Sequence, residues 1–119
     1  MRTMLRLAQE RDSVEVVDDQ HGQPTWTHDL AVLLRDLVVE GAPAGVHHGT
    51  SSGEATWYDL ARETYRLAGL DPERVRPTTS DRYPRPAPRP QYSVLANDGR
   101  MPDWRDGLRR ALPSVAEGP

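Results

Sequence analysis

The sequence of 119 residues predicts an α/β fold, because segments with helical periodicity alternate with short runs rich in β-branched residues. With 36% hydrophobic and 28% charged residues, the composition is typical of a globular chain and not of a disordered one. We expect about four helices and three short strands, in the order helix, strand, helix, strand, helix, strand, loop, helix. Three short strands make a small sheet, and such strands pair with a larger neighbouring sheet or with another chain. The chain is therefore expected to be a single incomplete region.

The beginning of the chain is expected to form a helix, a strand and a loop. Residues 3–11 carry apolar side chains at helical spacing, and residues 14–17 (Val-Glu-Val-Val) have the β-branched composition of a strand. The polar stretch 18–25 contains glycine and proline, which predicts a loop before the next helix.

The clearest helix is predicted over residues 27–40. Thr27 or Thr25 can cap its first turn, and Gly41 ends it. Aliphatic side chains at helical spacing are expected to form one buried face, which consists of Leu30, Leu33, Leu34, Leu37 and Val38.

A strand and a second strong helix follow. The strand is predicted over residues 45–49 (Gly-Val-His-His-Gly), and the helix over residues 56–68. Thr56 and Asp59 have the spacing of a capping box, in which a hydroxyl and a carboxylate bind free amides at the start of a helix. Gly69 ends the helix. One face of this helix is expected to carry Trp57, Leu60, Ala61, Thr64 and Ala68, with Trp57 in the core.

The last part of the chain is predicted to contain an edge strand at 74–78, an extended proline-rich loop at 81–92 and a helix at 103–112. The residues that this helix is expected to bury are Trp104, Leu108, Ala111 and Leu112.

The composition excludes several kinds of site. With no cysteine, the chain has no disulfide, thiolate nucleophile or cysteine-bound metal. All basic residues are arginine, so a Schiff-base lysine and a Walker A lysine are excluded. The net charge is −3 with the signs interspersed, which gives no surface for nucleic acid. No apolar run is long enough to span a membrane, and the amino terminus does not resemble a signal peptide, so we expect a cytoplasmic protein.

The histidines do not predict a metal site. His47 and His48 are adjacent in a predicted strand and would point to opposite faces. His21 and His28 show no spacing that fits a known ligand pattern.

Three segments carry a resemblance to a known enzyme family. They are VVDDQHGQPTWTHDLA at 16–31, GVHHGTSSGEATWYDLA at 45–61 and PRPAPRPQYSVL at 84–95. In order and spacing they resemble the carboxyl-terminal half of dTDP-4-dehydrorhamnose reductase, an extended short-chain dehydrogenase. The resemblance covers about residues 4–112. It implies that residues 1–119 are the carboxyl-terminal, substrate-binding part of a Rossmann-type fold.

The resemblance also implies an activity for the complete family enzyme, which uses NADP(H) to reduce the 4-keto group of a dTDP-sugar in dTDP-L-rhamnose biosynthesis. Such an enzyme holds the cofactor on a glycine-rich turn and uses a Tyr-x-x-x-Lys pair for catalysis. This chain has no such turn and no lysine. We therefore expect no catalytic and no cofactor-binding residue in it, no NADP(H) bound by it alone, and no reductase activity from it alone.

Two segments are candidates for binding a dTDP-sugar. Loops at the carboxyl ends of strands line the ligand crevice of doubly wound folds. The resemblance places the first loop beside the nucleotide sugar, and its candidate residues are Gln20, Gly22, Pro24 and Thr25. In the second segment the candidates are Arg89 and Ser93. The Arg89 guanidinium can bind a diphosphate in a bidentate manner, and for Ser93 a local turn or a backbone bond is the alternative expectation. The alternatives are a plain connecting loop and a surface arginine.

Three roles for the chain stay open. It can be the substrate-binding half that works with a Rossmann half or a full-length homologue. It can be a non-catalytic nucleotide-sugar-binding or regulatory subunit. The third alternative is a decayed remnant that binds no ligand.

Overall fold

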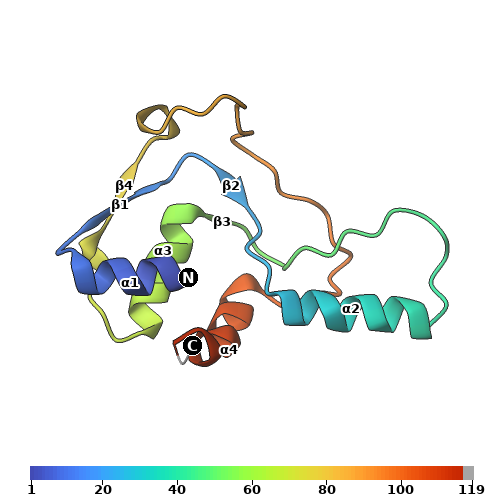
Figure 1. Cartoon of the computed structure of the whole chain (residues 1–119). Coiled ribbons are helices and arrows are strands. Elements are labelled where there is room, and N and C mark those ends of the chain that lie inside the picture. Colours follow the sequence, from blue (N-terminus) through green and yellow to red (C-terminus); the bar gives the residue numbers. More distant parts are fainter. Residues whose placement is uncertain (117–119) are drawn as a thin grey trace.

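The computed structural model describes residues 1–116 of the chain (Figure 1). Two short 3-10 turns, Pro72–Arg74 and Ser80–Arg82, flank the last strand. The helices and strands are α1 (Arg2–Glu10), β1 (Val14–Val17), β2 (His21–Gly22), α2 (Thr27–Val39), β3 (Ala55–Thr56), α3 (Trp57–Leu67), β4 (Val75–Thr78) and α4 (Trp104–Ala116). The predicted α/β class with four helices is confirmed.

The body of the molecule is built on a parallel pair of strands. β1 pairs with β4, with Val14 opposite Val75 and Val17 opposite Thr78. Helix α3 packs against both strands, and α1 packs against α3. The buried residues of this core are Val14, Ala61, Tyr65 and Val75.

A second small core joins α4 to the body. Trp104 and Leu108 pack with Ala55 of β3, and α4 contacts α3 and α1. The predicted face of this helix is confirmed, because Trp104, Leu108, Ala111 and Leu112 are all buried. The capping box is also confirmed: the Thr56 hydroxyl accepts from the Asp59 amide, and the Asp59 carboxylate accepts from the Thr56 amide.

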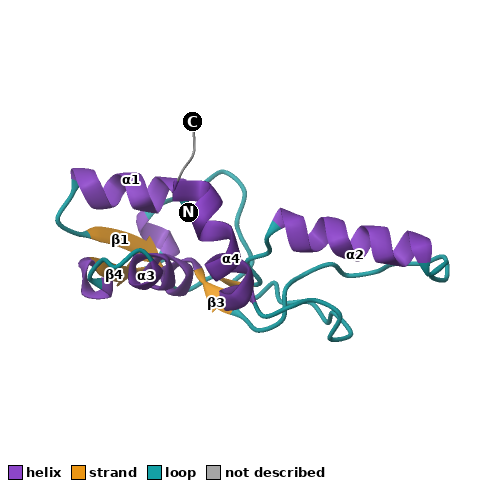
Figure 2. Cartoon of the chain, turned by 90° about the horizontal axis from the view of Figure 1, so that it is seen from below, coloured by secondary structure: helices purple, strands orange, loops and turns teal. Residues whose placement is uncertain are grey.

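Helix α2 projects from the body like an arm (Figures 1 and 2). The prediction of one buried face is wrong. Only Leu33 is buried among the five aliphatic residues that were expected to form this face. Leu34 and Val38 are 55% and 81% exposed. The predicted threonine cap is wrong as well: Trp26 occupies the N-cap position, and its side chain makes no capping bond. The periodicity is helical, but no element of the described chain covers this side of the helix.

The predicted strand at 45–49 is wrong, since the segment is irregular and exposed. A strand needs a neighbour to pair with, and none of residues 1–116 lies beside this segment as a strand. The structure has instead two very short strands, β2 and β3, which pair antiparallel. β2 falls inside the stretch predicted as a loop.

The core-facing side of α3 also differs from the prediction. Ala61 and Thr64 are buried as expected, but Trp57 is 58% exposed and Ala68 is exposed. Tyr65, which the prediction did not include, is fully buried at the centre of the first core. Trp57 starts the helix beside an open hollow, and that position keeps its indole out of the core.

Candidate functional site

A hollow with a volume of about 300 Å³ lies where three segments meet. The segments are the turn after β1, the β3–α3 junction and the end of the proline-rich loop. The residues that line the hollow are Gln20, His21, Gly22, Gln23, Pro24, Ala55, Thr56, Trp57, Arg89, Pro90 and Ser93. The hollow therefore combines residues that lie far apart in the sequence.

A larger hollow, of about 430 Å³, lies beside α1, β1 and Tyr83. It borders the start of β1, at Ser13 and Val14. In folds with parallel strands, ligands bind beyond the carboxyl ends of the strands. Gln20 and its neighbours follow the carboxyl end of β1, so we take the smaller hollow as the candidate site.

His21 is the centre of the hollow's backbone framework. On one side it pairs with Thr56 in the β2–β3 ladder. On the other side its amide donates to the Gln91 carbonyl at 2.8 Å, and its carbonyl accepts from the Ser93 amide at 3.0 Å. The Ser93 hydroxyl also donates to the His21 carbonyl, at 3.1 Å. Ser93 therefore bonds to the backbone, but to a residue 72 positions away and not locally.

Gln23 closes the framework with its side chain. Its Nε2 donates to the Leu95 carbonyl at 2.9 Å, and its Oε1 accepts from the Leu95 amide at 2.8 Å. The Gln23 side chain thus bonds the backbone of Leu95, 72 positions further along the chain, as a neighbouring strand would. The sequence analysis did not select Gln23, because a glutamine in a polar loop carries no signal of such a distant partner.

The floor of the hollow is attached to β1 through Thr56, which is 3% exposed. The Thr56 hydroxyl donates to Asp18 Oδ1 at 2.7 Å and accepts from the Asp59 amide at 3.1 Å. The end of β1 and the start of α3 are therefore held at a fixed separation across the hollow.

The proline-rich segment 81–90, called the strap below, is anchored before and after the hollow. Asp19 Oδ2 accepts from the Ser80 amide at 2.9 Å and from the Ser80 hydroxyl at 2.8 Å. These hydrogen bonds lower the pKa of the Asp19 carboxyl below its usual range. Past the hollow, the Tyr92 hydroxyl donates to Glu54 at 2.9 Å, which raises the pKa of Tyr92. Between these anchors the strap is exposed along its length.

The structure brings together most of the predicted site residues. Gln20, Gly22, Pro24, Arg89 and Ser93 all line the hollow, but Thr25 does not. The Thr25 hydroxyl donates to the Gln23 carbonyl and accepts from the Ser51 amide, so its role here is to hold the loop. Of the residues that the prediction left out of the site, Trp57 is the most informative, because its exposed indole lines the hollow.

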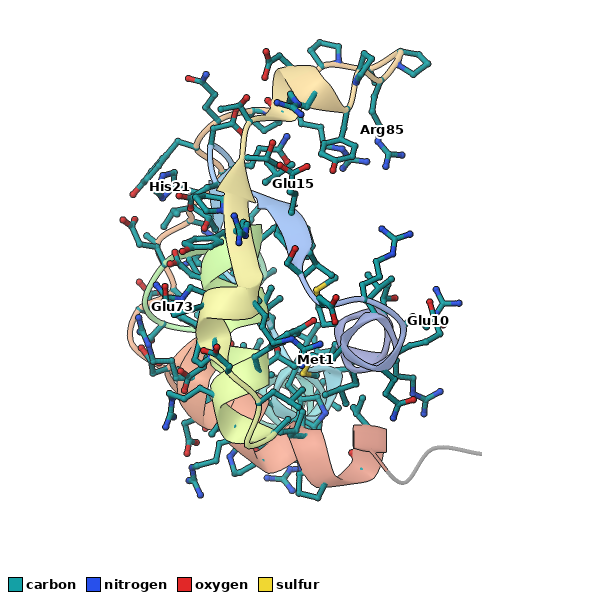
Figure 3. The ribbon with its side chains drawn as sticks, turned by 90° about the vertical axis from the view of Figure 1, so that its left-hand side faces the viewer. Met1, Glu10, Glu15, His21, Glu73 and Arg85 are labelled. Carbon is teal, nitrogen blue, oxygen red and sulfur yellow. The ribbon has the colours of Figure 1, made fainter. Side chains whose placement is uncertain are left out.

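The charge of the lining suits an anion. None of the described residues that line the hollow is acidic, and Arg89 is exposed on its rim. No ion pair within residues 1–116 engages Arg89. Arg85 does not line the hollow, and Figure 3 shows its side chain on the strap, well apart from His21. The hollow can therefore bind a phosphate group through Arg89, hydroxyl or carbonyl groups through Gln20, and a flat ring through Trp57.

No group of three metal-ligating side chains occurs among residues 1–116. None of the helices that the structure describes could cross a bilayer.

Comparison with known proteins identifies the family. The chain is 55% identical to a dTDP-4-keto-6-deoxy-D-glucose reductase of Streptomyces niveus over 95% of its own length and 41% of the relative's. It is 50% identical to a dTDP-4-dehydrorhamnose reductase of Streptomyces griseus, over 94% of this chain and 40% of that protein. The chain thus spans about two fifths of the length of these curated relatives.

Solved structures show the same fold. A dTDP-4-dehydrorhamnose reductase of Clostridium acetobutylicum superposes with a TM-score of 0.89 at 37% identity, covering 97% of this chain and 43% of that one. A Bacillus anthracis reductase in complex with NADP superposes with a TM-score of 0.85 at 31% identity, over 95% and 42%. The resemblance drawn from the three sequence segments is confirmed. Residues 1–116 match the family described as the RmlD substrate binding domain, and the chain belongs to that family.

Proposed function

We propose that this chain is the nucleotide-sugar-binding part of an NADPH-dependent reductase that acts on a dTDP-4-keto-6-deoxy sugar in dTDP-L-rhamnose biosynthesis. The observation that carries the proposal is the hollow at the end of β1, which has an arginine on its rim and no acidic residue among its described lining. It belongs to a chain of a substrate-binding family whose relatives are reductases of dTDP-sugars.

Each lining residue has a role in this proposal. Arg89 binds the diphosphate of the nucleotide sugar, because a guanidinium offers two parallel N–H donors to phosphate oxygens. Gln20 binds a sugar hydroxyl or a base carbonyl with its amide. Gly22 and Pro24 shape the backbone wall, and Ser93 fixes the end of the strap through the His21 carbonyl.

The residues present do not fit an NADP(H) site. A dinucleotide diphosphate binds at a helix N-terminus with free amides, next to a glycine-rich turn. Among the described helices, α3 follows a strand directly, but no glycine-rich turn precedes it, and the capping box engages the amides of Thr56 and Asp59. We therefore assign no step of hydride or proton transfer to this chain. We infer that the cofactor and the catalytic groups belong to the part of the reductase relatives that this chain does not cover.

Ligand binding by the isolated chain tests the proposal. We expect dTDP and dTDP-L-rhamnose to raise the melting temperature, because a ligand that binds only the native state stabilises it. Arg89→Ala should weaken binding about 10- to 100-fold, the usual effect of losing a charge-assisted hydrogen bond. The matched control is Arg85→Ala, which removes a strap arginine that lies outside the hollow.

Two results would refute the proposal. One is the absence of any dTDP-dependent stabilisation of a chain that melts cooperatively. The other is an equal loss of affinity for Arg85→Ala and Arg89→Ala, which would reduce the effect to unspecific attraction of an anion. Binding of dTDP without any reductase activity, even in the presence of a Rossmann half, would favour the non-catalytic binding subunit.

A further inference from the structure

The larger of the two hollows, here called the α1 hollow, has no role in the proposed function. Its volume of about 430 Å³ lies within the roughly 300–1,000 Å³ of small-molecule sites. Its walls are the side of α1 that carries Met4 and Leu7, the paired strands β1 and β4, and Tyr83 of the strap. None of its described lining residues also lines the candidate site. The α1 hollow can therefore hold a ligand of its own.

Two opposite charges lie side by side in the α1 hollow. Glu15 of β1 and Arg76 of β4 are opposite each other in the parallel pair, and neighbouring strands are about 4.8 Å apart. Both residues are exposed and line the hollow. Within residues 1–116 neither of them forms an ion pair. Each therefore keeps its charge available to a ligand.

Arg11 adds a second positive charge to the α1 hollow. It is the C-cap residue of α1, it is exposed, and it lines the hollow. No ion pair of the described chain includes it. On the surface of α3, by contrast, Arg62 pairs with Glu73 and Arg66 pairs with Glu63. The α1 hollow thus offers a ligand one carboxylate and two guanidinium groups.

Beside these charges the hollow has an apolar wall. Met4 and Leu7 are half-buried and pack against the first core, in which Val14 is buried. Tyr83 is 49% exposed, so one part of its ring is open to contact. An apolar group of a ligand gains free energy on such a wall, because the contact removes apolar surface from water. An aromatic group can also pack on the Tyr83 ring.

We propose that the α1 hollow binds a free α-amino acid with an apolar side chain. The α-carboxylate accepts hydrogen bonds from the Arg76 and Arg11 guanidinium groups, and the α-ammonium group donates to the Glu15 carboxylate. The side chain of the amino acid packs on the apolar wall and on Tyr83.

The spacing of the charges favours this class of ligand. In a free amino acid the two charged groups are attached to one carbon atom, which suits a carboxylate and a guanidinium carried by adjacent strands. A peptide terminus has only one of these two charges, and a phosphate ester has no ammonium group. The inference goes beyond the proposed function and does not depend on it.

Isothermal titration calorimetry of the full chain tests the ligand class, with L-phenylalanine as the probe. Three compounds each lack one feature of the probe: hydrocinnamate has no ammonium group, phenethylamine has no carboxylate, and L-alanine has no large side chain. We expect each of them to bind at least about fivefold more weakly than L-phenylalanine. The reason is the loss of a charge-assisted hydrogen bond in the first two and of apolar burial in the third.

Glu15→Gln removes the charge that binds the ammonium group. L-phenylalanine should then bind about fivefold or more weakly, whereas hydrocinnamate should bind equally well or better, because it no longer meets a like charge. The matched control is Glu10→Gln. Figure 3 shows Glu10 on the side of α1 turned away from Glu15, and it does not line the hollow. This control should leave the affinity for both compounds unchanged.

Arg76→Gln should weaken the binding of L-phenylalanine and hydrocinnamate alike, since both carry a carboxylate. Its matched control is Arg82→Gln, which removes the arginine next to Tyr83 that does not line the hollow. Glu15, Arg76 and both control residues are exposed. The melting curves of these variants without ligand should therefore match that of the parent chain.

Several outcomes would overturn the inference. They are no detectable binding below about 10 mM L-phenylalanine, equal affinities for L-phenylalanine and hydrocinnamate, and equal effects of Glu15→Gln and Glu10→Gln. Tighter binding of hydrocinnamate or phenethylamine than of L-phenylalanine would assign the hollow to a simple anion or cation and would overturn the amino-acid class.

The dTDP melting assay is independent of this test, because the two hollows have no described lining residue in common. Arg89→Ala should leave the affinity for L-phenylalanine unchanged, and Arg76→Gln should leave the dTDP-dependent stabilisation unchanged. Binding of dTDP without binding of the amino acid would refute only this inference. The converse result would refute only the proposed nucleotide-sugar site.

Discussion

Arg110→Ala tests how the arm is attached to the body of the molecule. Arg110 on α4 donates from Nη1 to Asp29 Oδ1 at 2.8 Å and from Nη2 to Asp29 Oδ2 at 2.6 Å. Asp29 lies in the first turn of α2 and is only 8% exposed. The Arg110 Nε also donates to Asp106 at 2.9 Å. These bonds, first those to Asp29, raise the pKa of the Arg110 guanidinium.

The size of the effect follows from the burial of Asp29. Removing one partner of a fully buried ion pair costs about 3–5 kcal/mol, because the other charge is left without compensation. The Arg110 side chain is 33% exposed, so water can enter the space that alanine leaves and hydrate part of the carboxylate. We therefore expect Arg110→Ala to lower the free energy of unfolding by about 2–3 kcal/mol. Adding Asp29→Asn should recover about 1 kcal/mol, since a neutral amide is cheaper to bury than a charge.

Urea unfolding followed by far-UV circular dichroism measures both values. The matched control is Arg109→Ala, one residue earlier, whose side chain is 64% exposed and pairs with Asp106 on the surface. That variant should lose less than about 1 kcal/mol. Equal losses for Arg109→Ala and Arg110→Ala would refute the reasoning, because the buried position of Asp29 would then have no energetic consequence. A further loss on adding Asp29→Asn would refute it as well.

Two further predictions concern the framework of the hollow. Thr56→Ala should destabilise the chain by about 1–2 kcal/mol, because it removes the helix cap and the bond to Asp18. Thr56→Ser keeps the hydroxyl and should cost clearly less in the same urea assay. Equal costs for the two variants would contradict the capping role. The pKa of Asp19 is lower in the folded chain than its usual value of 3.8, owing to its hydrogen bonds from Ser80. The stability that Asp19 contributes is therefore complete above pH 3.8 and is lost as the pH falls through the lower pKa of the folded chain. In acid titrations from about pH 5 to about pH 2, the stability gap between the wild type and Asp19→Asn should therefore shrink as the pH decreases, and a constant gap would contradict the assignment.

Much of the fold could be predicted from the sequence because its signals are local. The capping box of α3 involves two residues three positions apart, and Gly69 at the end of that helix has the positive φ of 71° that a helix-ending glycine adopts. The buried face of α4 follows from its spacing alone. The two strands of the central pair were recognisable from their β-branched residues, although their pairing was not.

The failures have one physical cause. The strand at 45–49 and the full burial of the α2 face were predicted from local patterns, but burial and pairing need a second surface. In the described chain that surface is absent from the outer part of α2, so Val38 and Val46 stay exposed. Trp57 is the converse case, because an apolar residue at helical spacing was expected in the core and lines the hollow instead.

The sequence by itself determined the helices, the capped start and glycine end of α3, the family, and the residue types available for binding: arginine and amide groups, without cysteine or lysine. Only the tertiary structure decided which of these residues share a site. Arg89 and Gln20 line one hollow because His21 bonds to Gln91 and Ser93 and because Gln23 holds Leu95 across 72 positions. In the same way, Arg110 holds the first turn of α2 to α4 across 81 positions. Helix caps and periodicity act within about four residues and are visible in a sequence. Contacts over such separations depend on how the whole chain packs, and no local pattern encodes them.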